Sequence, residues 1–314
     1  MLLPSRHDPY RISRRKLVGA AVSAPVLLAL ARGARSEESP QPMSFVRAAS
    51  ASDVDAHAAF GWEVLNEVLE RTRASHGDYT LAVSPDPAQA VRFRHPENNT
   101  DIQVNVVILT PAPDWNDYLL PVRIPLLRGL LGYRLLLVHR KDLDRFAGIE
   151  TLADLRGVTF GSVKHWVDTT IMKAAGIPVV TGTTYDGLFK MLQAHRFEAL
   201  SRGVHQIDAE MTAIEAAPGN DIVVEPHLLL HYFLPVYFWF SKDKEGRRRA
   251  ERVRSGLTAM VADGSLERMF DAAFGPVIEK YDLARRTVIE LANPQLSPED
   301  PVGDSRLWYR PPVR

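Results

Sequence analysis

Residues 151–210 alternate between strand and helix patterns, and this alternation narrows the possible folds more than any other part of the chain. Short runs rich in β-branched residues predict strands, and amphipathic runs between them predict helices. Such an order implies an α/β fold, because neighbouring parallel strands need a crossover connection, usually a helix. The loop at residues 161–168 then follows a strand and precedes a helix. Ligands of α/β proteins bind at such positions, so this loop is a candidate binding site.

The patterns outside this stretch predict a second set of strands and helices. The predicted strands are residues 43–48, 79–83, 101–110, 133–139 and 221–225. The predicted helices are residues 53–76, 244–263, 265–274 and 276–291. The apolar run at residues 228–240, which Pro235 interrupts, predicts a crossing of the chain between two domains. The proline-rich tail from Asn293 is predicted to be irregular and to pack through Trp308 and Tyr309.

The N-terminus has the pattern of an export signal. Arg14 and Arg15 form a twin-arginine pair, and a moderately apolar run follows at residues 19–31. This run is too short to span a hydrocarbon core of about 30 Å as a helix. We therefore predict that residues 1–31 are a twin-arginine signal peptide that is removed after export, which places the mature chain in the periplasm.

The composition is that of a globular protein and excludes several classes of site. The chain has 314 residues, of which 46% are hydrophobic and 24% charged, and this length suits two domains. Its formal net charge is zero, which gives no support to nucleic-acid binding. The sequence has no cysteine, so disulfides, thiolate catalysis and cysteine-ligated metals are excluded.

The sequence contains no recognisable catalytic or cofactor motif. A GxSxG elbow, a P-loop, a GxGxxG loop and an HExxH helix are all absent. His227 and His231 have the i, i+4 spacing of metal ligands on a helix, but the residues around them predict a strand. We therefore predict no catalysis, no metal site and no cofactor.

The loop at residues 161–168 and the helix start after it offer the first candidate ligand contacts. Trp166 has an aromatic face for stacking, and Asp168 and Thr169 add polar groups beside the backbone N–H groups of the helix start. An anionic ligand group would gain from those donors and from the positive end of the helix dipole. The alternative is structural, with Asp168 capping the helix while Trp166 packs. The sequence leaves both interpretations open.

Three charged residues complete the set of candidate contacts. Arg202 lies at the end of a predicted strand, so its guanidinium could grip a carboxylate or phosphate in the same crevice. Arg123 offers the same chemistry. Glu198 lies between apolar neighbours at the start of a short strand, close to where a crevice would lie. A surface position without a ligand role is the alternative for all three.

Three motifs resemble the extracellular solute-binding proteins of ABC-type importers. Residues 152–161 (LADLRGVTFG) match the pattern L-x-D-L-x-G-K-x-V-G that opens the second lobe in these proteins. Residues 191–199 loosely match M-L-x-x-G-R-x-D-A, and residues 262–266 match the D-G-(S/T) element near the C-terminus. Their order and spacing cover most of residues 45–275. The chain thus resembles a divergent member of family 3 of the extracellular solute-binding proteins, which have the type 2 periplasmic-binding fold.

The resemblance implies two α/β lobes, each a mostly parallel sheet flanked by helices, joined by two hinge crossings. In such proteins the ligand stabilises the closed state because it contacts both lobes at once. The implied boundaries are residues 1–31 for the signal peptide, 43–138 plus 232–292 for lobe 1, 139–231 for lobe 2 and 293–314 for an irregular tail.

One departure from the family pattern concerns the ligand. Amino-acid binders of this family carry T-x-x-R after the strand that matches residues 101–110, and the arginine holds the ligand carboxylate. Here Thr110 is followed by Pro-Ala-Pro, without an arginine at the matching place. The resemblance therefore does not assign an α-amino acid ligand, and Arg123 or Arg202 is left as a substitute.

The sequence as a whole predicts a monomeric periplasmic solute-binding protein. It would capture a small polar molecule, with anions among the candidates, and deliver it to the membrane permease of an ABC-type importer. One alternative is an enzyme on the same scaffold, similar to cyclohexadienyl dehydratase, in which Glu198 or a histidine supplies the acid. Another alternative is the extracytoplasmic input module of a sensor. No nucleic-acid partner is predicted.

Overall fold

The computed structural model describes residues 41–49, 56–112, 114–216 and 219–312. The predicted signal peptide at residues 1–31 lies outside these described residues. The described residues belong to one compact unit, Pro40–Arg314. Within them, no helix combines the length and the apolar composition that crossing a membrane requires.

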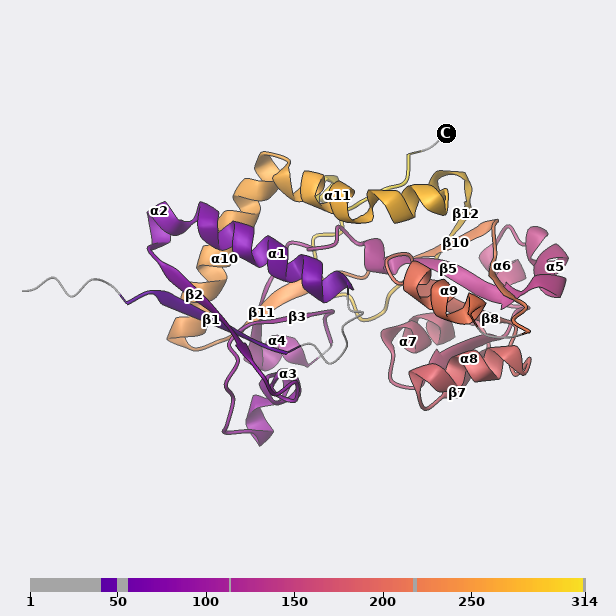
Figure 1. The fold of residues 1–314 in the computed structure, drawn as a ribbon, viewed down its shortest axis with the longest axis horizontal. Helices are drawn as coiled ribbons and strands as arrows, with labels where there is room; N and C mark the ends of the chain where they lie inside the picture. The colour runs from indigo at the N-terminus through magenta and orange to yellow at the C-terminus, as the bar shows by residue number, and fades with distance from the viewer. Residues whose placement is uncertain (1–40, 50–55, 113, 217–218, 313–314) are drawn as a thin grey trace, which may run out of the picture. The chain divides into compact units, whose positions relative to one another are not determined.

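A seven-stranded sheet forms the larger of two sheet regions (Figure 1). Its strand order is β12-β10-β5-β8-β6-β7, and β9 pairs with β5. The strands are β5 (Tyr133–His139), β6 (Phe160–Val163), β7 (Val179–Gly182), β8 (Ala199–Gly203), β9 (Ile222–Val224), β10 (Leu228–His231) and β12 (Thr287–Glu290). The three strands predicted within residues 151–210 are β6, β7 and β8, and β6 pairs in parallel with both others. The predicted α/β class is confirmed.

The larger sheet is mixed, where the sequence predicted a mostly parallel one. β5 runs antiparallel to β8, β9 and β10. Antiparallel neighbours need no helical crossover, so β5 can enter the sheet directly from the other region. The register pairs Arg134 with Gly203 and Leu135 with Arg202. This pairing brings two arginines onto neighbouring strands at the same end of the sheet.

Two smaller sheets form the second region. Their strands are β1 (Met43–Ala48) with β2 (Tyr79–Ser84), and β11 (Tyr237–Ser241) between β3 (Val107–Leu109) and β4 (Leu119–Val122). The strand predicted over residues 101–110 is shortened to β3. Just before β3, the Asn105 side chain accepts a hydrogen bond from Val46 N and donates one to Ser44 O. An amide side chain thus replaces part of the backbone ladder and ties this segment to β1.

β11 shows why the smaller region holds together. Successive side chains of a strand point to opposite faces, and Phe238 and Phe240 belong to one apolar cluster while Tyr237 and Trp239 belong to another. All four side chains are fully buried. Burial of a phenylalanine side chain contributes about 1.5–3 kcal/mol. The strand therefore joins two cores in one short segment.

The helices pack their apolar stripes on the sheets. α1 (Ala56–Arg71) buries the predicted stripe of Phe60, Val64 and Val68, and it lies against α10 (Lys244–Ala262), as Figure 1 shows. In the larger region, Thr184 is the N-cap of α8. Its hydroxyl accepts a hydrogen bond from Gly187 N. The other helices are α2 (Arg73–His76), α3 (Gln89–Arg94), α4 (Trp115–Tyr118), α5 (Leu143–Ala147), α6 (Leu152–Leu155), α7 (Val167–Ala174), α8 (Tyr185–Gln193), α9 (Ile207–Glu215) and α11 (Ser265–Lys280).

The helix predicted over residues 276–291 is wrong. α11 continues through Pro276 and ends at Lys280, and residues 287–290 form the strand β12. β12 pairs in parallel with β10. Three β-branched residues, Thr287, Val288 and Ile289, favour this extended conformation, and pairing with a buried strand outweighs the helical spacing of the apolar residues.

The chain passes between the two regions at residues 123–132 and 232–236, which we call the crossing segments, and a third time through α11 and residues 281–286 into β12. These two crossing segments touch at Gly132, whose carbonyl accepts a hydrogen bond of 3.2 Å from Tyr232 N. A Cβ atom on residue 132 would lie 1.8 Å from the Tyr232 carbonyl oxygen, so the close approach requires glycine. The domain boundaries implied by the sequence motifs stay a prediction.

The C-terminal tail is irregular and packs against the crossing segments, as predicted. Trp308 is 3% exposed, and its ring meets that of Phe233 edge-on with centroids 4.8 Å apart. Tyr309 N donates a hydrogen bond of 2.6 Å to Arg128 O. The tail therefore contacts both crossing segments.

Candidate functional site

The predicted loop between β6 and α7 lines a cavity of about 390 Å³, which we call the site cavity. Its lining residues are Ile108, Leu109, Thr110, Leu131, Arg134, His165, Trp166, Val167, Asp168, Arg202, Gln206, Leu234 and Val236. The smaller region and the crossing segments supply the apolar wall, and the larger region supplies most of the polar groups. Ligand pockets measure about 300–1,000 Å³, so the site cavity is large enough for a small molecule.

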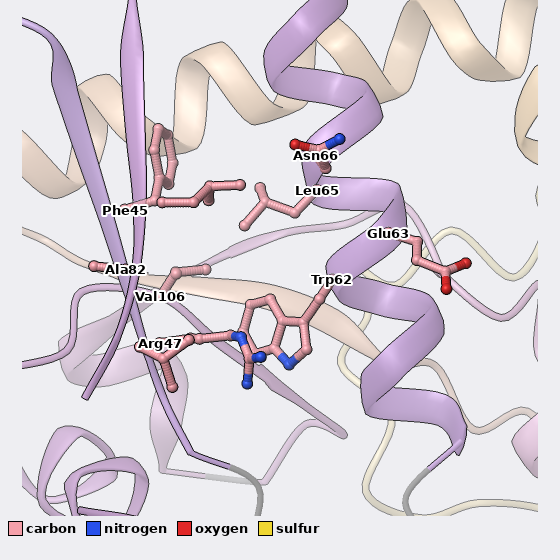
Figure 2. Close-up of a pocket in the computed structure, with 10 residues that line it drawn as sticks. Phe45, Arg47, Trp62, Glu63, Leu65, Asn66, Ala82 and Val106 are labelled. Atoms are coloured by element: carbon pink, nitrogen blue, oxygen red, sulfur yellow. The ribbon is translucent and has the colours of Figure 1, made fainter. Parts of the chain in front are cut away.

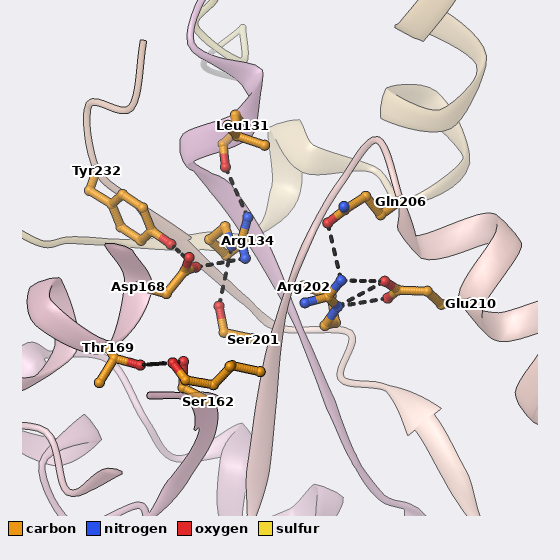
Figure 3. A network of polar contacts seen from close by, with 11 residues as sticks. Leu131, Arg134, Ser162, Asp168, Thr169, Ser201, Arg202, Gln206, Glu210 and Tyr232 are labelled. Atoms are coloured by element: carbon orange, nitrogen blue, oxygen red, sulfur yellow. Dashed lines mark hydrogen bonds and ion pairs between the residues drawn. The ribbon is translucent and has the colours of Figure 1, made fainter. Parts of the chain in front are cut away.

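Asp168 is the centre of a buried polar network on one wall of the site cavity (Figure 3). Its Oδ1 accepts a hydrogen bond of 2.5 Å from the Tyr232 hydroxyl and forms an ion pair of 2.6 Å with Arg134 Nη2. Arg134 also donates to Leu131 O at 3.1 Å and reaches Ser201 Oγ at 3.5 Å. Burial raises the pKa of Tyr232 well above its usual value. The phenol therefore stays protonated and donates a hydrogen bond to the Asp168 carboxylate.

The structural alternative for Asp168, a helix cap, is wrong. The N-cap of α7 is Trp166, and no side chain caps this helix. Asp168 lies one residue inside the helix, and the ion pair with Arg134 directs its carboxylate toward β5. The buried guanidinium on the neighbouring strand offers a stronger partner than the backbone N–H groups of the helix.

Arg202 lies in the cavity wall, and its guanidinium is bound to a carboxylate of the same region. Its Nε is 2.9 Å from both oxygens of Glu210, and its Nη2 donates to Gln206 Oε1 at 3.2 Å. The guanidinium carbon also lies 5.1 Å from the ring centroids of Trp166 and Tyr185. Burial opposes the charge on Arg202, but the hydrogen bonds to Glu210 and the charges of Glu210, Tyr185 and Asp168 together outweigh it, so the pKa of Arg202 is raised. Arg202 therefore holds Trp166 in place as part of a fixed cluster.

Thr169 is buried behind the cavity wall and does not line it. Its hydroxyl lies 2.7 Å from both Ser162 Oγ and Val163 O, as Figure 3 shows for the serine. These contacts join the first turn of α7 to β6. The residue thus fixes the position of the loop that carries Trp166.

The other two sequence candidates lie away from the site cavity. Arg123 forms 2.7 Å ion pairs with Asp300 and Glu299 of the C-terminal tail. Glu198 pairs with Arg145 and accepts a hydrogen bond of 2.8 Å from Thr159 N. Neither residue lines the site cavity.

Sequence reasoning missed two residues of the polar network, Arg134 and Tyr232. Arg134 is the single charged residue among β5's leucines and valine, and it is only 3% exposed. A lone arginine inside an apolar strand needs a buried partner, which is the signal that was available. Tyr232 is 1% exposed within the apolar run at residues 228–240, and nothing in its neighbourhood distinguishes it from a core residue.

A second cavity, of about 420 Å³, lies between α1 and the strands β1 and β2 (Figure 2). We call it the edge cavity. Its lining residues are Phe45, Arg47, Trp62, Glu63, Leu65, Asn66, Leu81, Ala82, Val83 and Val106. The Arg47 guanidinium carbon lies 5.2 Å from the Trp62 ring centroid, and Leu81 and Val83 are 46% and 50% exposed. Figure 2 shows Glu63 directed away from the strands.

Metal binding finds no candidate in the described part of the chain, where no group of three or more His, Asp or Glu side chains could hold an ion. The polar part of the site-cavity wall consists of ion pairs and hydrogen bonds, and the rest of the wall is apolar.

The sequence matches no known protein family and no curated protein. Solved structures to which it is similar include a mutant of ArgBP from T. maritima, at 16% identity and a TM-score of 0.47, over 74% of this chain and 96% of that one. The second substrate-binding domain of GlnP from Lactococcus lactis, in an open conformation, is 15% identical, with a TM-score of 0.45 over 75% and 97%.

A third similar structure is the L-cystine solute receptor of Neisseria gonorrhoeae in its unliganded open conformation. It is 14% identical to this chain, with a TM-score of 0.46 over 74% of this chain and 93% of that one. Such low identities carry no ligand over to this chain, so its function is argued from its own site.

Proposed function

We propose that this chain is a solute-binding protein that holds a small molecule in the site cavity. The observation that carries the proposal is the composition of the cavity wall. Ile108, Leu109 and Thr110 come from the smaller region, Leu234 and Val236 from a crossing segment, and most of the polar residues from the larger region. A ligand in this cavity contacts both sheet regions, so it stabilises the arrangement in which they face each other.

The crossing segments at residues 123–132 and 232–236 are the hinges in this proposal. They are short, they touch at Gly132, and both contact the C-terminal tail. Hinges of binding proteins are a few residues at the ends of strands that absorb the change in backbone angles. The tail would then limit how far the two regions can separate.

The cellular setting rests on sequence features. The twin-arginine pattern in residues 1–31 supports export to the periplasm. The three motifs that resemble solute-binding proteins support delivery of the ligand to the permease of an ABC-type importer. We propose a monomer, and the formal net charge of zero gives no support to nucleic-acid partners.

The enzyme alternative would need an acid or base in the site cavity. Asp168 and Glu210 are each engaged in an ion pair with a buried arginine, so neither carboxylate is free to act on a substrate. Glu198 lies outside the cavity, and His165 is the histidine on its wall. We therefore propose binding without turnover.

A thermal-shift screen of the purified chain tests the proposal. The compounds are amino acids, organic acids, polyamines and sugars, and a ligand should raise the melting temperature in a saturable way. A ligand at a hundredfold excess over its Kd stabilises the native state by about 2.7 kcal/mol. The Thr110→Trp variant fills the site cavity from its wall and should lose the shift. A compound that the chain converts to a product, or a screen without any saturable shift, would contradict the proposal.

A further inference from the structure

The cations of the site cavity are already bound to carboxylates of the protein. Arg134 is paired with Asp168, and Arg202 with Glu210. The side chains of Arg134, Arg202 and Glu210 are at least nine-tenths buried, and that of Asp168 is 12% exposed. Two positive and two negative charges therefore balance within the wall. A ligand carboxylate or phosphate would have to displace Asp168 or Glu210 to reach a guanidinium.

The start of α7 is also unfavourable for an anionic ligand. A helix N-terminus attracts negative charge through its dipole and its unpaired N–H groups. Asp168 stands in the first turn of α7, and its carboxylate, directed toward Arg134 on β5, adds a negative charge close to that helix start. A second negative charge beside it would be repelled, because both charges would lie in a partly buried wall where screening by water is weak.

Asp168 has one oxygen available for a ligand. Both contacts that the described residues make with its carboxylate fall on Oδ1, one from Tyr232 and one from Arg134. The side chain lines the site cavity and is 12% exposed, and Oδ2 is the oxygen that the Tyr232 hydroxyl does not bind. An ionised carboxylate only accepts hydrogen bonds. The matching ligand group is therefore an O–H or N–H donor.

The opposite wall determines the rest of the ligand. Ile108, Leu109, Leu131, Leu234 and Val236 present aliphatic side chains to the site cavity. Contact with them removes apolar ligand surface from water at about 25 cal/mol per Å². An apolar body of the ligand therefore fits against this wall while a donor group faces Asp168.

We propose that the ligand donates a hydrogen bond from a hydroxyl, amide or ammonium group to Asp168 Oδ2, packs an apolar body on the aliphatic wall and carries no net negative charge. This inference rests on the proposed function and specifies the ligand class of the same cavity. It also replaces the anion that the sequence left among the candidates. Asp168 and Glu210 together exclude carboxylates and phosphates, because each already occupies an arginine that such a group would bind.

Matched compounds test this ligand class. Three bodies (isopentyl, cyclohexylmethyl and 3-phenylpropyl) are each offered to the full chain as the alcohol, the primary amine and the carboxylate. Calorimetry or thermal shift should give saturable binding for alcohols or amines, and at least about tenfold weaker binding for the carboxylate of the same body. The alcohol and amine arms distinguish an uncharged ligand from a cationic one. Tighter binding of the carboxylates overturns the inference.

Two variants locate the effect. Asp168→Asn removes the acceptor charge and should weaken alcohol or amine binding by about tenfold or more. Glu210→Gln releases the Arg202 fork and should let the carboxylate members bind. Cooperative melting of each unliganded variant shows that it is folded, and Glu210→Gln provides the test if Asp168→Asn is not. If Glu210→Gln gains no carboxylate binding, the inference is overturned.

The outcome in which no matched compound binds also overturns this inference. It leaves the proposed function standing, because the broad thermal-shift screen asks separately whether any solute binds. A screen without any saturable shift overturns both proposals. The two failures are therefore distinguishable.

Discussion

The two cavities are similar in volume and differ in how their charges are held. In the site cavity of about 390 Å³, each arginine is bound to a carboxylate on a neighbouring element. In the edge cavity of about 420 Å³, Arg47 stacks on Trp62 and donates to the adjacent Ala48 O. The nearest acid in its lining, Glu63, is directed away from the strands (Figure 2). Cavity volume alone therefore does not show which of the two cavities is a binding site.

The difference teaches that fixed polar geometry is the better indicator of a site. A buried ion pair adds little net stability, because the desolvation of both charges offsets their attraction. Its retention beside a cavity is thus more informative than its energy, since it sets which ligand groups are accepted.

The largest difference is expected for the two arginines. Arg134→Met leaves Asp168 as a buried carboxylate without its ion-pair partner, which should lower the free energy of unfolding by about 3–5 kcal/mol. Arg47→Met removes a half-buried stacking contact and should cost only about 0.5–1 kcal/mol. Urea unfolding of both variants measures these values. Equal losses would show that the polar network is not the distinguishing feature.

A smaller difference is expected for two tyrosines. Tyr232→Phe removes the hydroxyl that donates to Asp168 and should cost about 1.5–3 kcal/mol at neutral pH. Tyr79→Phe removes a hydroxyl whose bond to Glu70 is exposed, and it should cost less than about 1 kcal/mol. Urea unfolding at neutral pH compares them.

The same two tyrosines should also affect how the free energy of unfolding changes with pH in the alkaline range. Burial raises the pKa of both Tyr232 and Tyr79 above the ordinary value. The folded chain then keeps protons that the unfolded chain loses near pH 10, so stability is full below about pH 10 and falls as the pH rises further. Tyr232→Phe should flatten this fall more than Tyr79→Phe does. Urea midpoints at pH 8 to pH 11 measure the slopes, and the reverse order would contradict the burial argument.

Ligand affinity should distinguish the two tryptophans. Trp166→Ala removes an aromatic wall of the site cavity and should weaken binding by about 0.5–1.5 kcal/mol beyond the lost contact area. Trp62 lines only the edge cavity, so Trp62→Ala should leave the affinity unchanged. Calorimetry with the ligand found in the screen provides the measurement. A loss of affinity in Trp62→Ala alone would move the binding site to the edge cavity.

The smallest effects are expected for two residues that the sequence singled out. Arg123→Gln and Glu198→Gln alter side chains whose partners are Asp300 and Arg145, away from the site cavity. Neither side chain lines the site cavity, so affinity should change less than about twofold in both variants. Titration of both variants with the same ligand checks this. A tenfold loss in either would return that residue to the site.

The sequence was sufficient for the elements whose pattern is local. The parallel strands β6, β7 and β8 and the cap at Thr184 follow from spacing and residue type over a few positions. The helix expected at residues 276–291 failed because β12 gains its pairing from β10, more than fifty residues earlier. Local periodicity contains no information about such a partner.

The site was predictable in part for the same reason. The loop with Trp166 and Asp168 could be found because a strand end and a helix start meet there. The partners of Asp168, namely Arg134 and Tyr232, come from β5 and a crossing segment and could not be paired from spacing. The role of Asp168 therefore changed from a helix cap to an acceptor held by an arginine.

The most direct test of the account is a titration of two variants that fill the two cavities. Thr110→Trp occupies the site cavity and Ala82→Trp the edge cavity, and neither substitution removes a buried partner. Isothermal titration calorimetry with the compound found in the screen should show one-to-one binding for the wild-type chain and for Ala82→Trp, and none for Thr110→Trp. Binding that survives in Thr110→Trp and disappears in Ala82→Trp would contradict the assignment of the site.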